Sequence, residues 1–326
     1  MSQTNYKYEL LKGSQKFICP ASGKRRFVPY VYAGTDTVVD ATVYGRCDRE
    51  ENCGYIQYPE STDEYQPQQW RTIKPPVQPA PKPLMEIPAD VMQRTFHNYD
   101  RNHLVNWLRG LFGDDPVQQA VEMYQIGTGR QWGDDGTTVF WQIDELGRIH
   151  AGKLMLYDEQ TGRRVKKDPQ TGADISRTTW VHSLLRLNDG QHDFVQCFYG
   201  THLLRLYPDK PVVLVESEKT ATICSIYYPD YIWLATGGSS MLSHGIDTGA
   251  VRCLYGKHVI LMPDAGMYDK WTQQADRLRP HCASVQVDQQ VDTAAQNNEQ
   301  IRIEGWDIAD FVVQSVRART DIMPHK

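Results

Sequence analysis

The last third of the chain alternates short apolar runs with segments of helical periodicity. Apolar, β-branched runs predict strands at Val212–Val215, 231–235, 259–262 and Ser284–Val287. Helical spacing predicts helices at Glu218–Tyr227, Tyr268–Leu278 and 307–316. Short buried strands that alternate with helices are typical of an α/β fold with a parallel sheet. We therefore predict such a domain over residues 209–326.

A mixed pattern of helices and strands precedes this domain, over residues 90–208. Asn102 can cap a first helix, whose apolar positions are Leu104, Leu108, Leu111 and Phe112. Asp115-Pro116 predicts the cap and first turn of a second helix. Alternating positions over 137–157 predict two strands joined by a hairpin turn at 144–147. We expect a small α+β subdomain here.

The beginning of the chain has a different composition. Residues 1–58 read as short strands and turns around Cys19, Cys47 and Cys53. Residues 59–89 then contain eight prolines, which disfavour both helix and sheet and favour extended, polyproline-type conformations. We predict a small β module at 1–58 and a proline-rich linker at 59–89.

Composition adds two constraints. The 326-residue chain carries a formal net charge of −5, so a nucleic-acid-binding surface would have to be a local basic patch. No segment approaches the roughly 18 apolar residues of a membrane span, and the start of the chain lacks a signal-peptide pattern, so we expect a cytoplasmic protein without a membrane partner. The seven cysteines are an odd number, which favours reduced thiols over a disulfide framework.

Acidic residues follow two of the predicted strands. Glu216 comes directly after the first strand and Asp264 after the third, while Asp307 and Asp310 open the last helix. The carboxyl ends of parallel strands lie at one edge of a sheet, so these side chains are expected to meet there. Gathered carboxylates repel one another unless a cation lies among them, and oxygen ligands suit Mg²⁺. We predict that Glu216, Asp264 and either Asp307 or Asp310 bind Mg²⁺, with Asp307 as our choice, and that Asp310 and Lys219 assist catalysis.

Each of these acids also has a purely structural interpretation. Glu216 and Glu218 flank a helix start where Ser217 can act as the cap, and Asp307 can cap the last helix. For any one residue we favour that interpretation, whereas their joint occurrence at successive strand ends favours a metal site. Gly237-Gly238 after the second strand offers backbone that could approach a phosphate, a weak signal by itself.

With these acids, the chain resembles the Toprim domain of bacterial replicative primases, topoisomerases and certain nucleases. In that family a glutamate follows the first strand and an Asp-x-Asp motif follows a later one, and together they bind Mg²⁺. Val215-Glu216-Ser217 resembles the first motif and Pro263-Asp264-Ala-Gly266 the second, while 307–310 is similar to a late Asp-x-x-Asp segment. The second aspartate of Asp-x-Asp is Gly266 here, so the resemblance implies a site that lacks one ligand unless Asp269 or Asp307 replaces it.

The resemblance covers about residues 95–316. The hairpin Phe140-Trp-Gln-Ile-Asp-Glu-Leu-Gly147 and the segment Cys197-Phe-Tyr-Gly200 are similar to the primase subdomain that precedes Toprim. As a whole, the chain resembles proteins of bacterial mobile elements and phages that join a zinc ribbon to a Toprim domain. The implied partners are single-stranded DNA, nucleotides and a helicase or other replication protein.

The first three cysteines are similar to the zinc ribbon with which such primases begin. A structural zinc needs four Cys or His ligands, and Cys19, Cys47 and Cys53 supply three, while Ser22 stands at the fourth position. The alternative is a metal-free ribbon with a core of Phe27, Tyr30, Tyr32 and Tyr44. Lys24, Arg25 and Arg26, interleaved with aromatic residues, suggest a single-strand-binding surface, and a solvated face explains them equally well.

A second basic group follows the predicted hairpin. It comprises Lys153, Arg163, Arg164, Lys166 and Lys167, which could line a channel for a phosphate backbone or form an ordinary exposed loop. We therefore predict a primase-like protein that performs Mg²⁺-dependent nucleotidyl transfer. The alternatives are a DNA-binding or replication accessory protein with a degenerate Toprim site, and a Toprim nuclease.

Overall fold

The computed structural model describes residues 7–48, 53–59, 82–132, 136–168, 170–187, 192–238 and 240–322. The chain divides into two units, Met1–Pro79 and Ala80–Lys326. The predicted linker lies at their junction, and its residues 60–81 are outside the described part of the chain. The bounds of the four predicted segments remain predictions.

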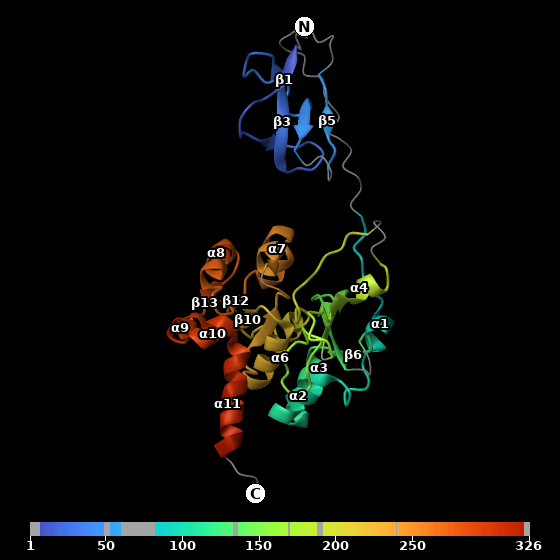
Figure 1. Ribbon diagram of the computed structural model, residues 1–326, viewed down its shortest axis with the longest axis vertical. Helices are drawn as coiled ribbons and strands as arrows, with labels where there is room; N and C mark the ends of the chain where they lie inside the picture. Colours follow the sequence, from blue (N-terminus) through green and yellow to red (C-terminus); the bar gives the residue numbers. More distant parts are fainter. Residues whose placement is uncertain are drawn as a thin grey trace. The chain divides into compact units, whose positions relative to one another are not determined.

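The first unit is built on one small antiparallel sheet (Figure 1). Its strands are β1 (Tyr8–Leu10), β2 (Phe17–Ile18), β3 (Arg25–Tyr32), β4 (Gly45–Cys47) and β5 (Ile56–Gln57). The strand order is β1-β3-β4-β5, and β2 also pairs with β3. The core of this unit comprises Cys19, Phe27 and Cys47, against which Phe17, Cys53 and Tyr55 pack. Of the aromatic core expected without metal, only Phe27 is fully buried, so the cysteines themselves are central to this unit.

The second unit begins with helices that cover an antiparallel sheet. The helices are α1 (Ala89–Gln93), α2 (His103–Phe112), α3 (Asp114–Met123), α4 (Val181–Leu184) and α5 (Leu203–Leu206). The strands are β6 (Gly127–Gly129), β7 (Thr137–Ile143), β8 (Ile149–Leu156) and β9 (Thr178–Trp180), paired in that order. The predicted hairpin is confirmed, with Gly147 N donating to Asp144 O at 3.0 Å.

The rest of the second unit surrounds a sheet whose strands are all parallel. Its strands are β10 (Val212–Val215), β11 (Ile232–Ala235), β12 (His258–Leu261) and β13 (Ser284–Val287), in the order β11-β10-β12-β13. The helices are α6 (Glu218–Tyr227), α7 (Met241–Thr248), α8 (Tyr268–Leu278), α9 (Gln290–Asn297), α10 (Glu299–Glu304) and α11 (Ile308–Ile322), with a 3₁₀ turn η1 at Ala250–Leu254. The predicted α/β class with a parallel sheet is confirmed for this part of the chain.

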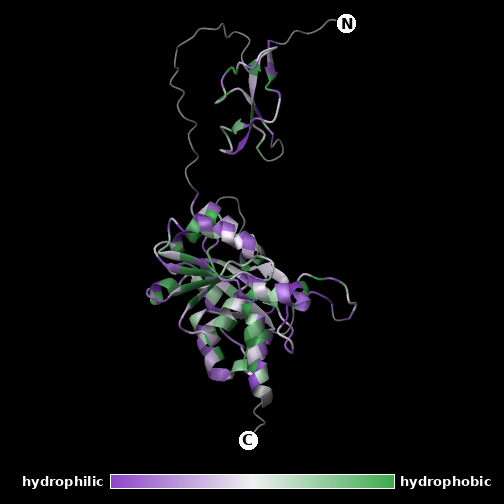
Figure 2. Ribbon diagram, turned by 90° about the vertical axis from the view of Figure 1, so that its left-hand side faces the viewer, coloured by the Kyte–Doolittle hydropathy of each residue, from purple (hydrophilic) through white to green (hydrophobic). Residues whose placement is uncertain are grey.

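One continuous core joins the two sheets of the second unit. Figure 2 shows hydrophobic residues concentrated in the strands and on the inner faces of the helices. Helix α6 packs on β10 and β11, and α3 and α11 pack on α6. The buried Tyr124 hydroxyl at the end of α3 donates to Trp233 O on β11 at 2.8 Å, and the Tyr124 ring stacks on Tyr199 at 5.0 Å. These contacts fix the antiparallel subdomain against the parallel sheet.

The caps of helices α2 and α3 differ in how well the sequence predicted them. The Asn102 cap is confirmed, because its side chain accepts from Val105 N at 3.2 Å. The prediction that Asp115 caps α3 is wrong: Gly113, whose φ is 85°, occupies that position. A left-handed φ of this size suits glycine and disfavours aspartate. In the described part of the chain, no helix combines the length and apolar character that crossing a bilayer requires.

Candidate functional site

The predicted acids lie at the carboxyl edge of the parallel sheet, near enough for their charges to interact. Glu216 follows β10 and Asp264 lies just beyond β12, and these two strands are hydrogen-bonded neighbours. Asp307 precedes α11, and Asp310 lies in its first turn. Thr220 on α6 donates its hydroxyl to Asp307, which ties the start of α11 to the helix that follows Glu216. We refer to Glu216, Asp264, Asp307 and Asp310 as the acidic cluster.

The carboxylates of the acidic cluster interact electrostatically. Burial raises the pKa of Asp264 to about 8, with the charges of Asp307, Glu216 and Asp310 acting in the same direction. Burial also raises the pKa of Glu216, although the nearby Lys270 and Lys153 oppose that shift. The pKa of Asp310 is raised by burial and by Asp307. Such shifts show that negative charge is crowded into a poorly solvated place, which a bound cation would relieve.

The acidic cluster has the chemistry that a divalent cation requires. Burial and the acidic neighbours of Asp264 all raise its pKa, and none of these main influences is a cation. The donor set consists of hard carboxylate oxygens, which match Mg²⁺. However, in the described part of the chain the only group of three or more ligand atoms within 4.8 Å of one another is formed by cysteines. The acidic cluster thus fits Mg²⁺ in its chemistry and charge. Its carboxylate oxygens are not all within 4.8 Å of one another.

The capping interpretation of the helix starts is confirmed. Ser217 Oγ accepts from Thr220 N at 3.1 Å and caps α6. Asp307 Oδ1 accepts from Ala309 N at 2.8 Å, and Asp310 Oδ2 accepts from Asp307 N at 3.0 Å, a reciprocal capping arrangement. Capping fixes both carboxylates in place, and the other Asp307 oxygen, Oδ2, accepts the Thr220 hydroxyl.

Gly266 adopts a conformation suited to its lack of a side chain. Its φ is 80°, and its N–H donates to Asp292 Oδ1 on α9 at 2.7 Å. Neither Asp292 nor Asp269 is among the main groups that shift the pKa of Asp264, whereas Asp307 is. Asp269 lies at the start of α8, on the side of the loop that follows Gly266. Of the two residues considered as replacements for the missing aspartate, Asp307 is therefore the one whose charge is felt at Asp264.

Lys153 differs from the other predicted basic residues. Its ammonium group lies 3.1 Å from both carboxylate oxygens of Glu218 and donates to Gly237 O at 2.9 Å. The side chains of Lys153 and Glu218 are only 10% and 2% exposed. The prediction that Lys153 grips a phosphate backbone is therefore corrected, because its charge is buried and already paired. It joins β8 to the start of α6 and to the loop after β11.

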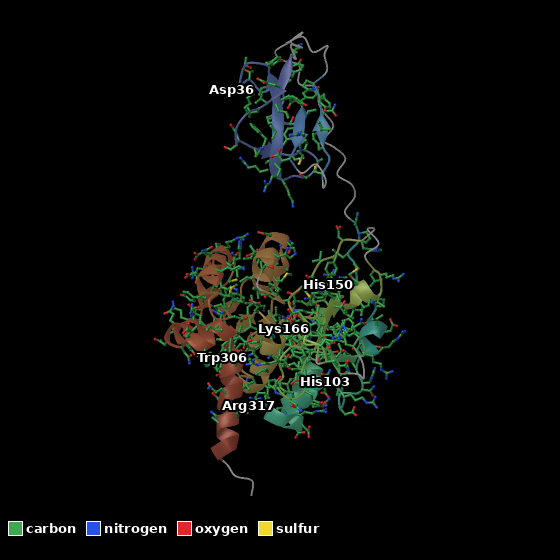
Figure 3. The ribbon with its side chains drawn as sticks, in the orientation of Figure 1. Asp36, His103, His150, Lys166, Trp306 and Arg317 are labelled. Atoms are coloured by element: carbon green, nitrogen blue, oxygen red, sulfur yellow. The ribbon has the colours of Figure 1, made fainter. Side chains whose placement is uncertain are left out.

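The remaining basic residues of this group lie on the surface beside the acidic cluster. A pocket of about 430 Å³ is lined by basic residues together with two of the acids: Arg163, Arg164, Lys166, Lys219, Asp307 and Asp310. A second hollow of about 700 Å³ shares Arg163 and Arg164 and extends to Lys167, Arg177 and Trp132, with Asp158 and Glu159 also in its lining. We call these two hollows together the basic trench. Figure 3 labels Lys166 near the centre of the second unit and Trp306 close to α10.

A third pocket of about 400 Å³ lies next to the basic trench. It is lined by Trp107, Trp306, Lys219, Arg163 and Arg317, among others. Lys219 Nζ lies 5.6 Å from the centre of the Trp107 ring and donates to Gly162 O at 3.3 Å. The indole N–H of Trp107 is buried without a hydrogen-bond partner among the described residues. We call this hollow the tryptophan pocket; sequence reasoning missed it because its residues come from distant segments.

Gly162 permits the close packing of this region. Its φ is +65°, and a Cβ atom at this position would lie 2.3 Å from the Trp107 ring. We expect Gly162→Ala to displace the loop and to destabilise the protein by about 1 to 3 kcal/mol, through overpacking and backbone strain. Urea unfolding would measure the decrease, and Gly172→Ala, at a similar φ but with open space around it, is the matched control. Equal destabilisation of the two variants would show that the packing against Trp107 contributes nothing.

The first unit contains a separate candidate metal centre. The sulfur atoms of Cys19, Cys47 and Cys53 all lie within 4.8 Å of one another. Burial would raise the pKa of the Cys19 thiol, but hydrogen bonds from Ser22, Ala21 and Cys53 outweigh it and lower that pKa to about 7. A thiol that ionises easily is suited to bind zinc. The three cysteines predicted to bind zinc are therefore together, while Lys24, Arg25 and Arg26 are exposed beside them.

Comparison with solved structures finds primases at low similarity. The primase fragment of the bacteriophage T7 primase-helicase protein is 16% identical, with 70% of this chain and 81% of that chain covered and a TM-score of 0.37. The RNA polymerase domain of Mycobacterium tuberculosis primase DnaG, in complex with a DNA oligomer, is 9% identical over 71% and 78%, with a TM-score of 0.38. The E. coli primase catalytic core is 13% identical over 71% and 77%, with a TM-score of 0.31. With TM-scores below 0.5, these similarities say nothing about activity.

Two protein families match the sequence itself. Residues 5–68 match a zinc beta-ribbon finger family. Residues 102–265, a span that includes Glu216 and Asp264, match a family described as a domain of unknown function (DUF6371). No curated protein matches the chain. Because residues 102–265 are half of its 326 residues, the chain belongs to the DUF6371 family.

Proposed function

We propose that this protein is a Toprim-type, primase-like nucleotidyltransferase that acts on single-stranded DNA. The observation that carries the proposal is the half-buried Asp264 at the carboxyl edge of a parallel sheet, where burial and the charges of Glu216, Asp307 and Asp310 raise its pKa. A buried group of like charges next to a basic surface is a costly arrangement for stability alone. It is well suited to hold a metal ion and phosphates together.

In this proposal the acids would bind the metal ion, and basic residues of the trench would bind phosphates. Glu216, Asp264 and Asp307 would hold Mg²⁺, which when bound neutralises phosphate charge and stabilises a leaving pyrophosphate. Lys219 and Arg163, which line both the basic trench and the tryptophan pocket, would orient the phosphates of an incoming nucleotide. Asp310 would hold the first turn of α11 in position through its bond to Asp307 N.

The two pockets offer complementary surfaces to a nucleotide. Arg163, Arg164, Lys166 and Lys167 are exposed along the trench, where their charges can reach a phosphate backbone. The tryptophan pocket offers the half-buried Trp306 ring, on which a base could stack, while the Trp107 ring is buried against Gly162. In the first unit, the exposed Lys24, Arg25 and Arg26 would add a second contact to the template. By its resemblance to proteins of phages and mobile elements, the chain would serve replication of such an element, together with a helicase.

Primer synthesis is the direct test. Purified full-length protein would be incubated with Mg²⁺, four ribonucleotides and single-stranded templates, and the labelled products separated by size. We expect short oligomers from the wild type and none from Asp264→Asn. Shortened template without oligomers would indicate a Toprim nuclease. Template binding without any product, in wild type and variant alike, would indicate a DNA-binding accessory protein with a degenerate site.

Binding to the basic trench can be tested separately. We expect Arg163→Ala combined with Arg164→Ala to weaken binding of single-stranded DNA and to reduce the slope of log K against log salt by about 0.7 for each phosphate that is no longer neutralised. Fluorescence anisotropy at several salt concentrations would measure both. Arg205→Ala is the matched control, because Arg205 is exposed on α5 and lines none of the three pockets. An unchanged salt slope in the double variant would contradict the assignment of the trench.

A further inference from the structure

The loop from Cys19 to Lys24 has the form of a metal-binding turn. Cys19 N donates to Lys24 O and Gly23 N donates to Cys19 O, both at 2.8 Å, and Gly23 has a φ of +64°. A tight turn of this kind presents two side chains, three residues apart, to one metal ion. The first of these side chains is Cys19, and the second is Ser22. We propose that the Ser22 hydroxyl oxygen is the fourth ligand of a zinc ion bound by Cys19, Cys47 and Cys53.

The spacing of the sulfur atoms fits zinc. Sulfur atoms about 2.3 Å from a tetrahedral zinc lie about 3.8 Å from one another. Cys19 Sγ and Cys53 Sγ lie 3.7 Å apart, and Cys47 Sγ lies within 4.8 Å of both. All three thiols are free, so no disulfide explains their approach. The cluster therefore has one face of a tetrahedron already assembled.

Ser22 has the position and the unsatisfied oxygen that a fourth ligand requires. Its Oγ atom is buried and lies close enough to the Cys19 thiol to favour a thiolate there, yet it makes no hydrogen bond of normal geometry with any described residue, a costly state for a hydroxyl group. Among the described residues, no histidine, aspartate or glutamate joins the three cysteines. A bond to zinc would give this oxygen a partner, and it would explain why a hydroxyl group is buried here without a normal hydrogen bond.

This ligand set has consequences for the ion. Zinc prefers soft thiolates, so a neutral serine oxygen binds it more weakly than a fourth cysteine. Three thiolates and one hydroxyl also leave the centre with one negative charge, whereas four thiolates leave two. The inference concerns the first unit alone and does not depend on nucleotidyl transfer.

A metal titration of the full-length protein tests the proposal. Co²⁺ would be added to the reduced wild type, to Ser22→Cys and to Ser22→Ala, with the visible d–d absorption recorded, and Zn²⁺ affinity would follow from competition. We expect Ser22→Cys to give a four-sulfur spectrum and to bind Zn²⁺ more tightly by on the order of 100-fold, and Ser22→Ala to bind it more weakly by on the order of tenfold. Ser14→Ala, at an exposed serine of the same unit, should leave both unchanged.

Three results would overturn the proposal. Equal affinity in the wild type and Ser22→Ala would assign the fourth position to water or to another residue. A four-sulfur spectrum in the wild type would assign it to a cysteine from elsewhere. Absence of binding in the wild type with tight binding in Ser22→Cys would show that the natural unit is metal-free. Because these readouts are spectroscopic, they stay informative whether or not the protein makes primers.

Discussion

Replacing Asp264 with asparagine is expected to stabilise the protein at pH 8 in the absence of divalent cations, and to abolish its stabilisation by Mg²⁺. In the wild type, burial raises the pKa of Asp264 from 3.8 to about 8 in the folded state, with the neighbouring acids adding to the shift. Asparagine keeps the size of the side chain and removes the charge. Thermal unfolding at several pH values, with and without Mg²⁺, would measure both effects.

The sign of the pH dependence follows from proton linkage. Between about pH 4 and pH 8 the folded state keeps a proton on Asp264 that the unfolded state has released. The contribution of this group to the free energy of unfolding therefore falls as the pH rises through that window, by at most roughly 1.4 kcal/mol per pH unit. Asp264→Asn should lack this part of the slope. Mg²⁺ competes with the proton, so it should stabilise the wild type more at pH 8 than at pH 6.

Asp269→Asn is the matched control for this experiment. Asp269 is an aspartate in the first turn of α8, five residues from Asp264. If it is not a ligand, its variant should keep both the pH slope and the response to Mg²⁺. Equal stabilisation of Asp264→Asn and the wild type by Mg²⁺ would remove Asp264 from the metal site and with it the main support for the proposed chemistry.

Lys153→Met is expected to be the most destabilising of the substitutions considered, by about 3 to 5 kcal/mol. Its ammonium group is the cation that contacts the buried Glu218 carboxylate, at 3.1 Å to both oxygens. Methionine fills similar volume but leaves that carboxylate buried and without its partner. The destabilisation should appear as a lower urea midpoint at pH 7.

The double variant Lys153→Met, Glu218→Gln separates charge from packing. With both charges removed, much of the stability should return, because an uncompensated buried charge costs more than a neutral pair. If the loss of stability in the double variant equalled the sum of the losses in Lys153→Met and Glu218→Gln, the two residues would be energetically independent. A destabilisation below about 1 kcal/mol for Lys153→Met would show that the pair is solvated in solution.

Local sequence features predicted the elements that carry the site. Every residue of β10 is buried, and a strand buried in this way appears in the sequence as the unbroken apolar run Val212–Val215. The helix after it begins directly after Ser217, a residue type that commonly caps helices, and Ser217 does cap α6. The same reasoning missed α9 and α10, whose residues are mainly polar and whose buried positions are few. It also placed the cap of α3 at Asp115, because the left-handed backbone of Gly113 cannot be read from composition.

The electrostatic roles of individual residues required the tertiary structure. Lys153 and Arg163 are both basic residues in or just beyond one hairpin, yet the first is buried against Glu218 and the second lines the pockets beside the acidic cluster. Nothing in the local sequence distinguishes them, because the partner of Lys153 lies 65 residues away in the chain. The tryptophan pocket likewise combines Trp107 and Trp306, which come from α2 and from the segment before α11.

The sequence by itself determined the α/β class, the hairpin, and the types of residue that could form an Mg²⁺ or zinc site, because strand and helix periodicity and ligand chemistry are local properties of the chain. Only the tertiary structure decided which charges are buried, which are paired and which face a common space. Burial and distance set the pKa of Asp264, the pairing of Lys153 and the unsatisfied oxygen of Ser22, and both depend on segments that are far apart in the chain.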